Sequence, residues 1–79
     1  MAKERNRKII YDYSKLRGKI KEVFNTQKAF AVAMNMDFVS INQRLNNIVD
    51  WKTSDITRAC ALLGIPLVEV YRYFFVEKI

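Results

Sequence analysis

The side chains best suited to recognition chemistry in this chain are two adjacent carboxamides, Asn42 and Gln43. A carboxamide can both accept and donate a hydrogen bond at the edge of adenine in the DNA major groove. Val39 lies four residues before Gln43, so on a helix it shares the same outward face. An exposed Val there can contact a thymine methyl group or a second copy of the chain. The pattern predicts a surface that reads A·T-rich DNA.

The composition argues against catalysis and metal binding. The chain has no His, one Cys and eight acidic residues, and no two carboxylates stand at a spacing that suits acid–base catalysis. Cys60 lies on the apolar side of an expected helix, where it would act as a small buried hydrophobic residue. We therefore expect no enzyme activity, no metal site and no cofactor.

The helix that must hold the carboxamides outward is expected at about residues 37–46. Ile41 and Leu45 are four residues apart and are expected to pack into the core behind it. Asp37 is expected to cap its N-terminus. Phe38 lies at the edge of the apolar stripe, so it is either a core residue or a contact for a thymine methyl group.

A second short helix, at about residues 27–34, is expected to precede it across a tight turn. Asn25 or Thr26 can cap this helix, and Asn35 tolerates the left-handed backbone that a sharp turn needs. Gln27 stands at the helix N-terminus, where backbone N–H groups and its own amide suit a phosphate oxygen. The alternative is a Gln that only caps the helix or faces solvent.

Two further helices are expected to complete the core. The first spans about residues 13–24, and its apolar residues form an inward stripe. The other spans about residues 54–63 and can be capped by Thr53 or Ser54. Trp51, the lone Trp of a small domain, is expected to pack in the core or cover it.

The tail, residues 66–79, is open to two interpretations. Its apolar residues fit a fifth helix, but β-branched and aromatic types also suit a strand. They exceed what one side of a short helix can bury, which indicates either a dimer surface or packing back over Tyr11 and Tyr13. The residues of this dimer surface would be Val70, Tyr71, Tyr73, Phe74 and Phe75.

Size and charge set further limits. With 79 residues the chain is expected to form one domain. The first 21 residues carry eight Lys and Arg against two acidic residues, which accounts for the whole net charge of +6. This asymmetry indicates a polyanionic partner, nucleic acid before membrane, and the alternative is a solubilising tail. Residues 1–10 are expected to be a basic arm that either lies along DNA or is disordered. No apolar run reaches the length of a membrane span.

Four segments together resemble a known family: residues 11–20 (YDYSKLRGKI), 26–36 (TQKAFAVAMNM), 40–47 (SINQRLNN) and 51–66 (WKTSDITRACALLGIP). They resemble the lambda-repressor-like and Cro helix-turn-helix proteins of the XRE type, and more closely the small Cro-like regulators of phages of Gram-positive bacteria. The resemblance covers roughly residues 11–75 and implies a compact all-α fold of five helices that acts on DNA in a bacterial host; residues 11–79 are expected to form this domain. The single Cys and the charged start of the chain indicate a reducing, cytoplasmic setting. The sequence departs from the pattern at Asn35, where Gly is commoner, and at Arg44, where several relatives carry an apolar residue.

The predicted DNA-contact residues fall into two groups. Base contacts are expected from Phe38, Val39, Asn42 and Gln43. Contacts to the DNA backbone are expected from Arg17, Thr26, Gln27, Lys28, Ser40, Arg44, Asn46, Asn47 and Lys52. For the two adjacent Asn residues, a helix C-cap is the alternative role.

Two functions remain under consideration. The first is a sequence-specific repressor of the Cro type that binds double-stranded operator DNA as a homodimer and acts in the switch between lysogenic and lytic growth, with residues 37–46 in the major groove. The second is a protein-interaction module, a modulator or antirepressor, that binds a larger phage repressor through Phe38 and Val39 or through the aromatic tail. The apolar, weakly charged third helix supports the second hypothesis, and titration with promoter DNA would separate the two.

Overall fold

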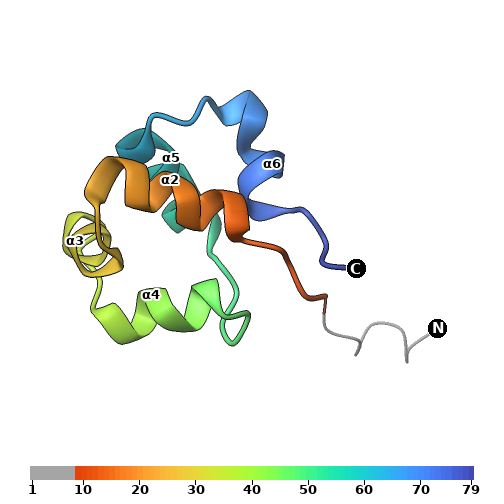
Figure 1. Cartoon of the computed structure of the whole chain (residues 1–79), viewed down its shortest axis with the longest axis horizontal. Helices are drawn as coiled ribbons and strands as arrows, with labels where there is room; N and C mark the ends of the chain where they lie inside the picture. Colours follow the sequence, from red (N-terminus) through yellow and green to blue (C-terminus); the bar gives the residue numbers. More distant parts are fainter. Residues whose placement is uncertain (1–8) are drawn as a thin grey trace.

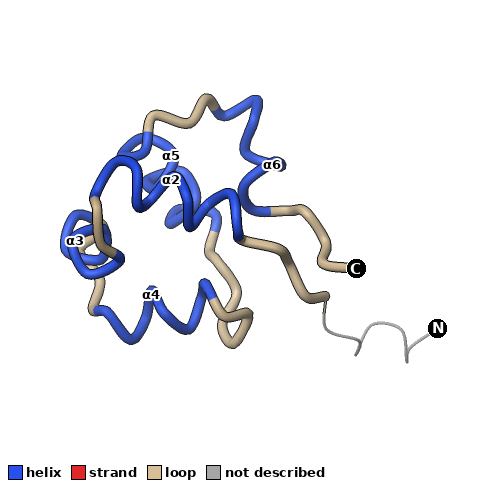
Figure 2. The backbone as a smooth tube through the Cα atoms, viewed as in Figure 1, coloured by secondary structure: helices blue, strands red, loops and turns tan. Residues whose placement is uncertain are grey.

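Five α-helices and one short 3-10 helix make up the regular structure of residues 9–79, the part of the chain that this computed structural model describes. The elements are α2 (Ser14–Phe24), α3 (Gln27–Ala33), α4 (Phe38–Leu45), α5 (Thr53–Leu63), η1 (Leu67–Glu69, the 3-10 helix) and α6 (Val70–Phe74). Figure 2 shows helices joined by loops, with no strand in the described residues. The prediction of an all-α, five-helix fold is confirmed. Most of the predicted basic arm, residues 1–10, lies outside the described residues.

The central element of the fold is α2, which contacts α3, α5 and α6. In Figure 1, α2 passes in front of α5, while α3 and α4 form the left and lower edges of the molecule. α3 and α4 also pack on each other. No helix of residues 9–79 combines the length and the apolar composition needed to cross a bilayer.

The core is built from apolar residues of all five α-helices. Leu16, Phe30 and Ile41 come from three different helices and have no exposed surface. Leu45 and Cys60 are also buried, as the sequence predicts. Truncating a buried Leu, Ile or Phe to Ala costs about 2–5 kcal/mol. Contacts of this strength fix the rotation of each helix about its axis, and so decide which side of α4 faces solvent.

Short polar side chains begin α3 and α4 as the sequence predicts. The Thr26 hydroxyl accepts a hydrogen bond from the Ala29 backbone N–H at 3.0 Å, and the Asp37 carboxylate accepts one from the Ser40 N–H at 2.7 Å. Between the two helices, Asn35 has a backbone φ of 60°. Because Asn adopts this left-handed conformation more readily than most residues, it can replace the commoner Gly in the turn.

The predicted cap of α5 is wrong. Lys52 occupies the N-cap position, and no side chain hydrogen-bonds to the first backbone N–H groups. Thr53 is already helical, and its carbonyl accepts a hydrogen bond from the Thr57 hydroxyl at 3.0 Å. At its other end, α5 stops at Gly64, which has a φ of 71°, a conformation that Gly adopts without steric cost.

The tail forms a short helix and then an extended segment. Phe74, in α6, is 1% exposed, and its ring lies edge-on to Trp51 with the centroids 5.2 Å apart. After α6 the chain runs back along the start of the described residues, where Tyr11 forms an isolated antiparallel bridge with Glu77. The rings of Tyr11 and Phe75 pack at 6.1 Å. The predicted fifth helix and the predicted return of the tail over Tyr11 are therefore confirmed, and so is the packing of Trp51. Phe74, in contrast, is a core residue and not part of a dimer surface.

Candidate functional site

The outer face of α4 is exposed because Ile41 and Leu45 hold the opposite face in the core. Phe38 and Val39 expose 46% and 61% of their surfaces. Of the two positions predicted for the Phe38 side chain, in the core or at the surface, the structure shows the one at the surface. The outward placement of Val39 is confirmed. Two neighbouring apolar side chains at the start of a solvent-facing helix are suited to contact with a partner.

The carboxamides of α4 are less accessible than the sequence predicts. Asn42 and Gln43 are both half-buried. The side-chain oxygen of Asn42 accepts hydrogen bonds from the side-chain amides of Gln27 and Asn46, each at 3.2 Å. Because two-point pairing with adenine requires this oxygen as an acceptor, Asn42 would have to share it with both neighbours.

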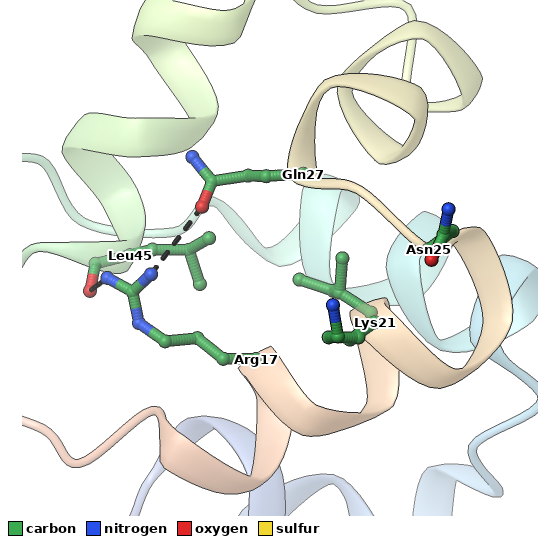
Figure 3. Close-up of a pocket in the computed structure, with 6 residues that line it drawn as sticks. Arg17, Lys21, Asn25, Gln27 and Leu45 are labelled. Carbon is green, nitrogen blue, oxygen red and sulfur yellow. Dashed lines mark hydrogen bonds between the residues drawn. The ribbon is translucent and has the colours of Figure 1, made fainter.

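Arg17 joins α2 to the surface formed by α3 and α4 (Figure 3). Its guanidinium donates hydrogen bonds to the backbone carbonyl of Leu45 at 3.0 Å and to the Asn46 side chain at 3.1 Å. A longer bond of 3.5 Å reaches the side-chain oxygen of Gln27. Three residues predicted to contact the DNA backbone (Arg17, Gln27 and Asn46) are thus brought together on one side of α4.

A pocket of about 200 Å³ opens beside this network. It is lined by Arg17, Ile20, Lys21, Asn25, Gln27 and Leu45. Lys21 and Asn25 were not among the predicted contact residues. The signal that could have found Lys21 is its spacing, because it lies four residues after Arg17 and so on the same side of α2.

Arg44 does not face solvent, and its predicted contact with DNA phosphate is therefore wrong. The residue is 9% exposed. Its Nη1 donates a hydrogen bond to the Ser40 carbonyl at 3.0 Å, and its Nε lies 3.5 Å from the Asp55 carboxylate of α5. Arg44 follows Ile41 by three residues, so helical spacing alone places it towards the core. The partner on α5 could not be found from that spacing.

Asn47 also has a structural role, and its predicted phosphate contact stays a prediction. Its side-chain oxygen accepts a hydrogen bond from the Tyr11 N–H at 2.9 Å, and its side-chain amide donates one to the Tyr11 carbonyl at 3.0 Å. Asn46 is the C-cap of α4, so the alternative role predicted for this pair is confirmed for Asn46. Among the other predicted backbone contacts, Thr26, Lys28 and Lys52 are exposed, whereas Ser40 is half-buried.

The predicted dimer surface is reduced by the fold of the tail. Tyr71 and Phe75 remain about half exposed, and Val70 and Tyr73 pack partly against the core. The Lys15 ammonium lies 5.3 Å from the centre of the Tyr73 ring. Dimerisation through Tyr71 and Phe75 stays a prediction.

The titratable groups near α4 and α5 serve structure. The hydrogen bond from the Ser40 backbone N–H lowers the pKa of the Asp37 carboxyl, which keeps a negative charge at the N-terminus of α4. Burial raises the pKa of the Cys60 thiol, which disfavours the nucleophilic thiolate. No cluster of three His, Cys, Asp or Glu side chains within residues 9–79 could hold a metal ion. The chemistry that this arrangement offers is recognition through an apolar face and an adjacent cationic pocket.

Comparison with known proteins gives this surface a context. The sequence model of the family DUF739, described as a protein of unknown function, matches residues 9–77. Among solved structures, the chain is similar to the solution structure of the modulator of repression (MOR) of the temperate bacteriophage TP901-1 from Lactococcus lactis, with a TM-score of 0.75 and 40% sequence identity over 82% of this chain and 88% of that chain. The comparison with curated proteins gave no match. The similar structure belongs to a phage regulator, but its name refers to modulation of repression and not to an operator.

Proposed function

Because this chain belongs to the DUF739 family and is 40% identical to a phage modulator of repression, we propose that it is itself a modulator that binds a phage repressor protein. The outer face of α4 would form the centre of the contact. This conclusion favours the protein-interaction hypothesis over the Cro-type operator-binding hypothesis.

The observation that carries the proposal is the chemistry of the α4 surface. Phe38 and Val39 are exposed there, while Arg44 is turned inward against Asp55. The charge that remains at the start of the helix is the negative one of Asp37. Affinity for DNA depends mainly on cations that neutralise phosphates, whereas the centres of protein interfaces are apolar and depleted in charge. The face of α4 matches the second description.

Operator binding is the second candidate function, and one feature favours it. The net charge of +6 resides in residues 1–21, and Arg17, Lys21 and Gln27 gather beside α4. Phosphates flanking a DNA groove could be held there while α4 enters the groove. A Cro-like role through this geometry would need Val39 to meet a base edge.

A single substitution on α4 separates the two functions. The full-length chain would be titrated calorimetrically with each candidate repressor encoded in the same genome, and separately with duplexes from that genome's promoter regions. Val39→Lys places a cation at the centre of the apolar face. It should weaken repressor binding by about 30-fold, since burying an unpaired charge costs at least about 2 kcal/mol. Binding to DNA should fall much less, because the added cation is attracted to the phosphates even where a base contact of Val39 is lost.

Val68→Lys is the matched control. Val68 is the most exposed Val, at 83%, and it lies in η1 rather than on α4. This variant should bind the repressor within about twofold of the wild type, the range expected for a residue outside the contact. Tight binding of the wild type to a duplex at physiological salt, without binding to any repressor, would instead establish the operator-binding function.

A further inference from the structure

We infer that the pocket between α2, α3 and α4 receives a carboxylate side chain of the repressor, next to an apolar side chain that packs on Phe38 and Val39. The inference rests on the proposed function, because it specifies the chemistry of the partner's surface. Two properties of the pocket lead to it: its uncompensated positive charge, and its apolar floor.

The positive charge of the pocket is not neutralised within the described residues. Arg17 and Lys21 lie four residues apart on α2 and both line the pocket, and none of the lining residues is acidic. Within residues 9–79, neither of the two forms a salt bridge, whereas Lys19 on the same helix pairs with Glu22 at 3.7 Å. Two adjacent cations with no acidic neighbour in the pocket form a site for an anion.

The guanidinium of Arg17 is already oriented for such a contact. Its Nη2 is fixed by the Leu45 carbonyl and the Asn46 side chain. An Arg side chain has five N–H donors, and the hydrogen bonds of Arg17 in the described part of the chain leave its Nε–H unused. Because the side chain is held in place before binding, less conformational entropy is lost when an anion is bound.

The floor of the pocket selects a carboxylate side chain over a phosphate. Ile20 and Leu45 line it, and each is only 3% exposed because both also belong to the core. Methylene groups of Asp or Glu can pack on these two residues while the carboxylate reaches Arg17 and Lys21. A phosphate group has no methylene of its own that could make this contact.

The hydrogen-bonded network beside the pocket extends onto the side of α4 that carries Val39. Val39, Asn42 and Asn46 are spaced at i, i+3 and i+7, so they lie along one side of the helix. Asn42 and Asn46 belong to the hydrogen-bonded network that includes Arg17 and Gln27. The partner should therefore present an apolar group where α4 begins and an acidic group where it ends.

Charge reversal at Lys21 tests the inference. Lys21→Glu and Lys21→Gln would be titrated, as full-length chains, against the repressor that binds the wild type. Lys21 is exposed on α2, and circular dichroism would verify that both variants fold. Affinity should fall by about tenfold for Lys21→Glu and about threefold for Lys21→Gln, as expected for loss or reversal of one partly desolvated ion pair. Affinity of the wild type should also depend more steeply on salt than that of Lys21→Gln.

Lys19→Glu is the matched control, because Lys19 carries the same charge on the same helix but does not line the pocket. It should change the affinity by less than about twofold. If Lys21→Glu binds as well as the wild type while Val39→Lys does not, the inference fails and the proposed function stands. If the wild type binds no repressor, both fail. If Lys21→Glu loses affinity for a duplex alone, the pocket holds a phosphate and the inference is overturned.

Discussion

The ion pair between Arg44 and Asp55 gives the sharpest test of how the α4 surface is built. Only 11% of the Arg44 side chain and 20% of the Asp55 side chain are exposed, and Nε lies 3.5 Å from the carboxylate oxygen. At an effective dielectric constant of about 20, two charges at this distance attract each other by about 5 kcal/mol before the cost of desolvation. Removing one member of such a pair leaves the other charge buried without compensation.

Asp55→Asn should therefore destabilise the protein by about 2–3 kcal/mol, below the range of about 3–5 kcal/mol for fully buried pairs because Asp55 is partly exposed. For a domain of this size, the midpoint of thermal unfolding should fall by about 8–24 °C. Arg44→Met should cost less than about 1 kcal/mol, since it leaves the more exposed partner and keeps an apolar side chain of similar length. The measurement is chemical and thermal unfolding followed by circular dichroism.

The double variant separates the ion pair from the other role of Asp55. Asp55 also lies in the first turn of α5, where its charge favours the helix N-terminus by about 0.3–1 kcal/mol. In the Arg44→Met background, Asp55→Asn should cost only this smaller amount, and the difference between backgrounds measures the pair. Equal costs in the two backgrounds would refute the argument that Asp55 holds Arg44 in place.

Two further predictions concern the rest of the fold. Asn47→Ala should destabilise the protein by about 2–3 kcal/mol, because it removes both hydrogen bonds to Tyr11 and because Ala adopts a φ of 62° less readily than Asn does. Asn47→Gly should cost less because Gly accepts that φ, and equal costs for the two variants in denaturant titrations would contradict the role given to the backbone. Burial raises the pKa of Tyr13 from 10.0 to about 12 in the folded protein. As the pH rises, the unfolded state therefore loses its phenolic proton before the folded state does. The stability that Tyr13 contributes below pH 10 should be lost between pH 10 and 12. Tyr13→Phe should remove this loss of stability, and an unchanged pH profile in that variant would show that another group causes it.

Local patterns predicted much of the fold. The four-residue spacing of Ile41 and Leu45 predicted the buried side of α4. Thr26 and Asp37 predicted the starts of α3 and α4, and Asn35 predicted the turn between them. Each of these inferences depends on residues within one or two turns of one another, and the structure agrees with them. Phe74 was misplaced because its burial depends on Trp51, which is distant in the chain.

The site was harder to predict because its side chains are satisfied by distant residues. Asn47 hydrogen-bonds to Tyr11, 36 positions earlier in the chain, and Arg44 pairs with Asp55 on another helix. An Asn or Arg next to an expected recognition helix is equally compatible with a DNA contact and with a structural bond. Sequence spacing gives the face of the helix on which such a residue lies, but not the partner that the tertiary fold brings to it.

The inward position of Arg44 accounts for the uneven charge of the candidate surface. An outward Arg44 would have placed a cation on α4 itself. The ion pair with Asp55 instead leaves α4 with an apolar start, and the positive charge of the neighbouring pocket comes from Arg17 and Lys21 on α2. A partner that matches both regions must combine apolar and acidic groups over a short distance, which a folded protein surface can do and a regular phosphate backbone cannot. The same buried ion pair that stabilises α4 against α5 thus sets the chemistry of the surface that α4 presents. Asp55→Asn should therefore weaken the proposed repressor contact only to the extent that it frees Arg44 to turn outward.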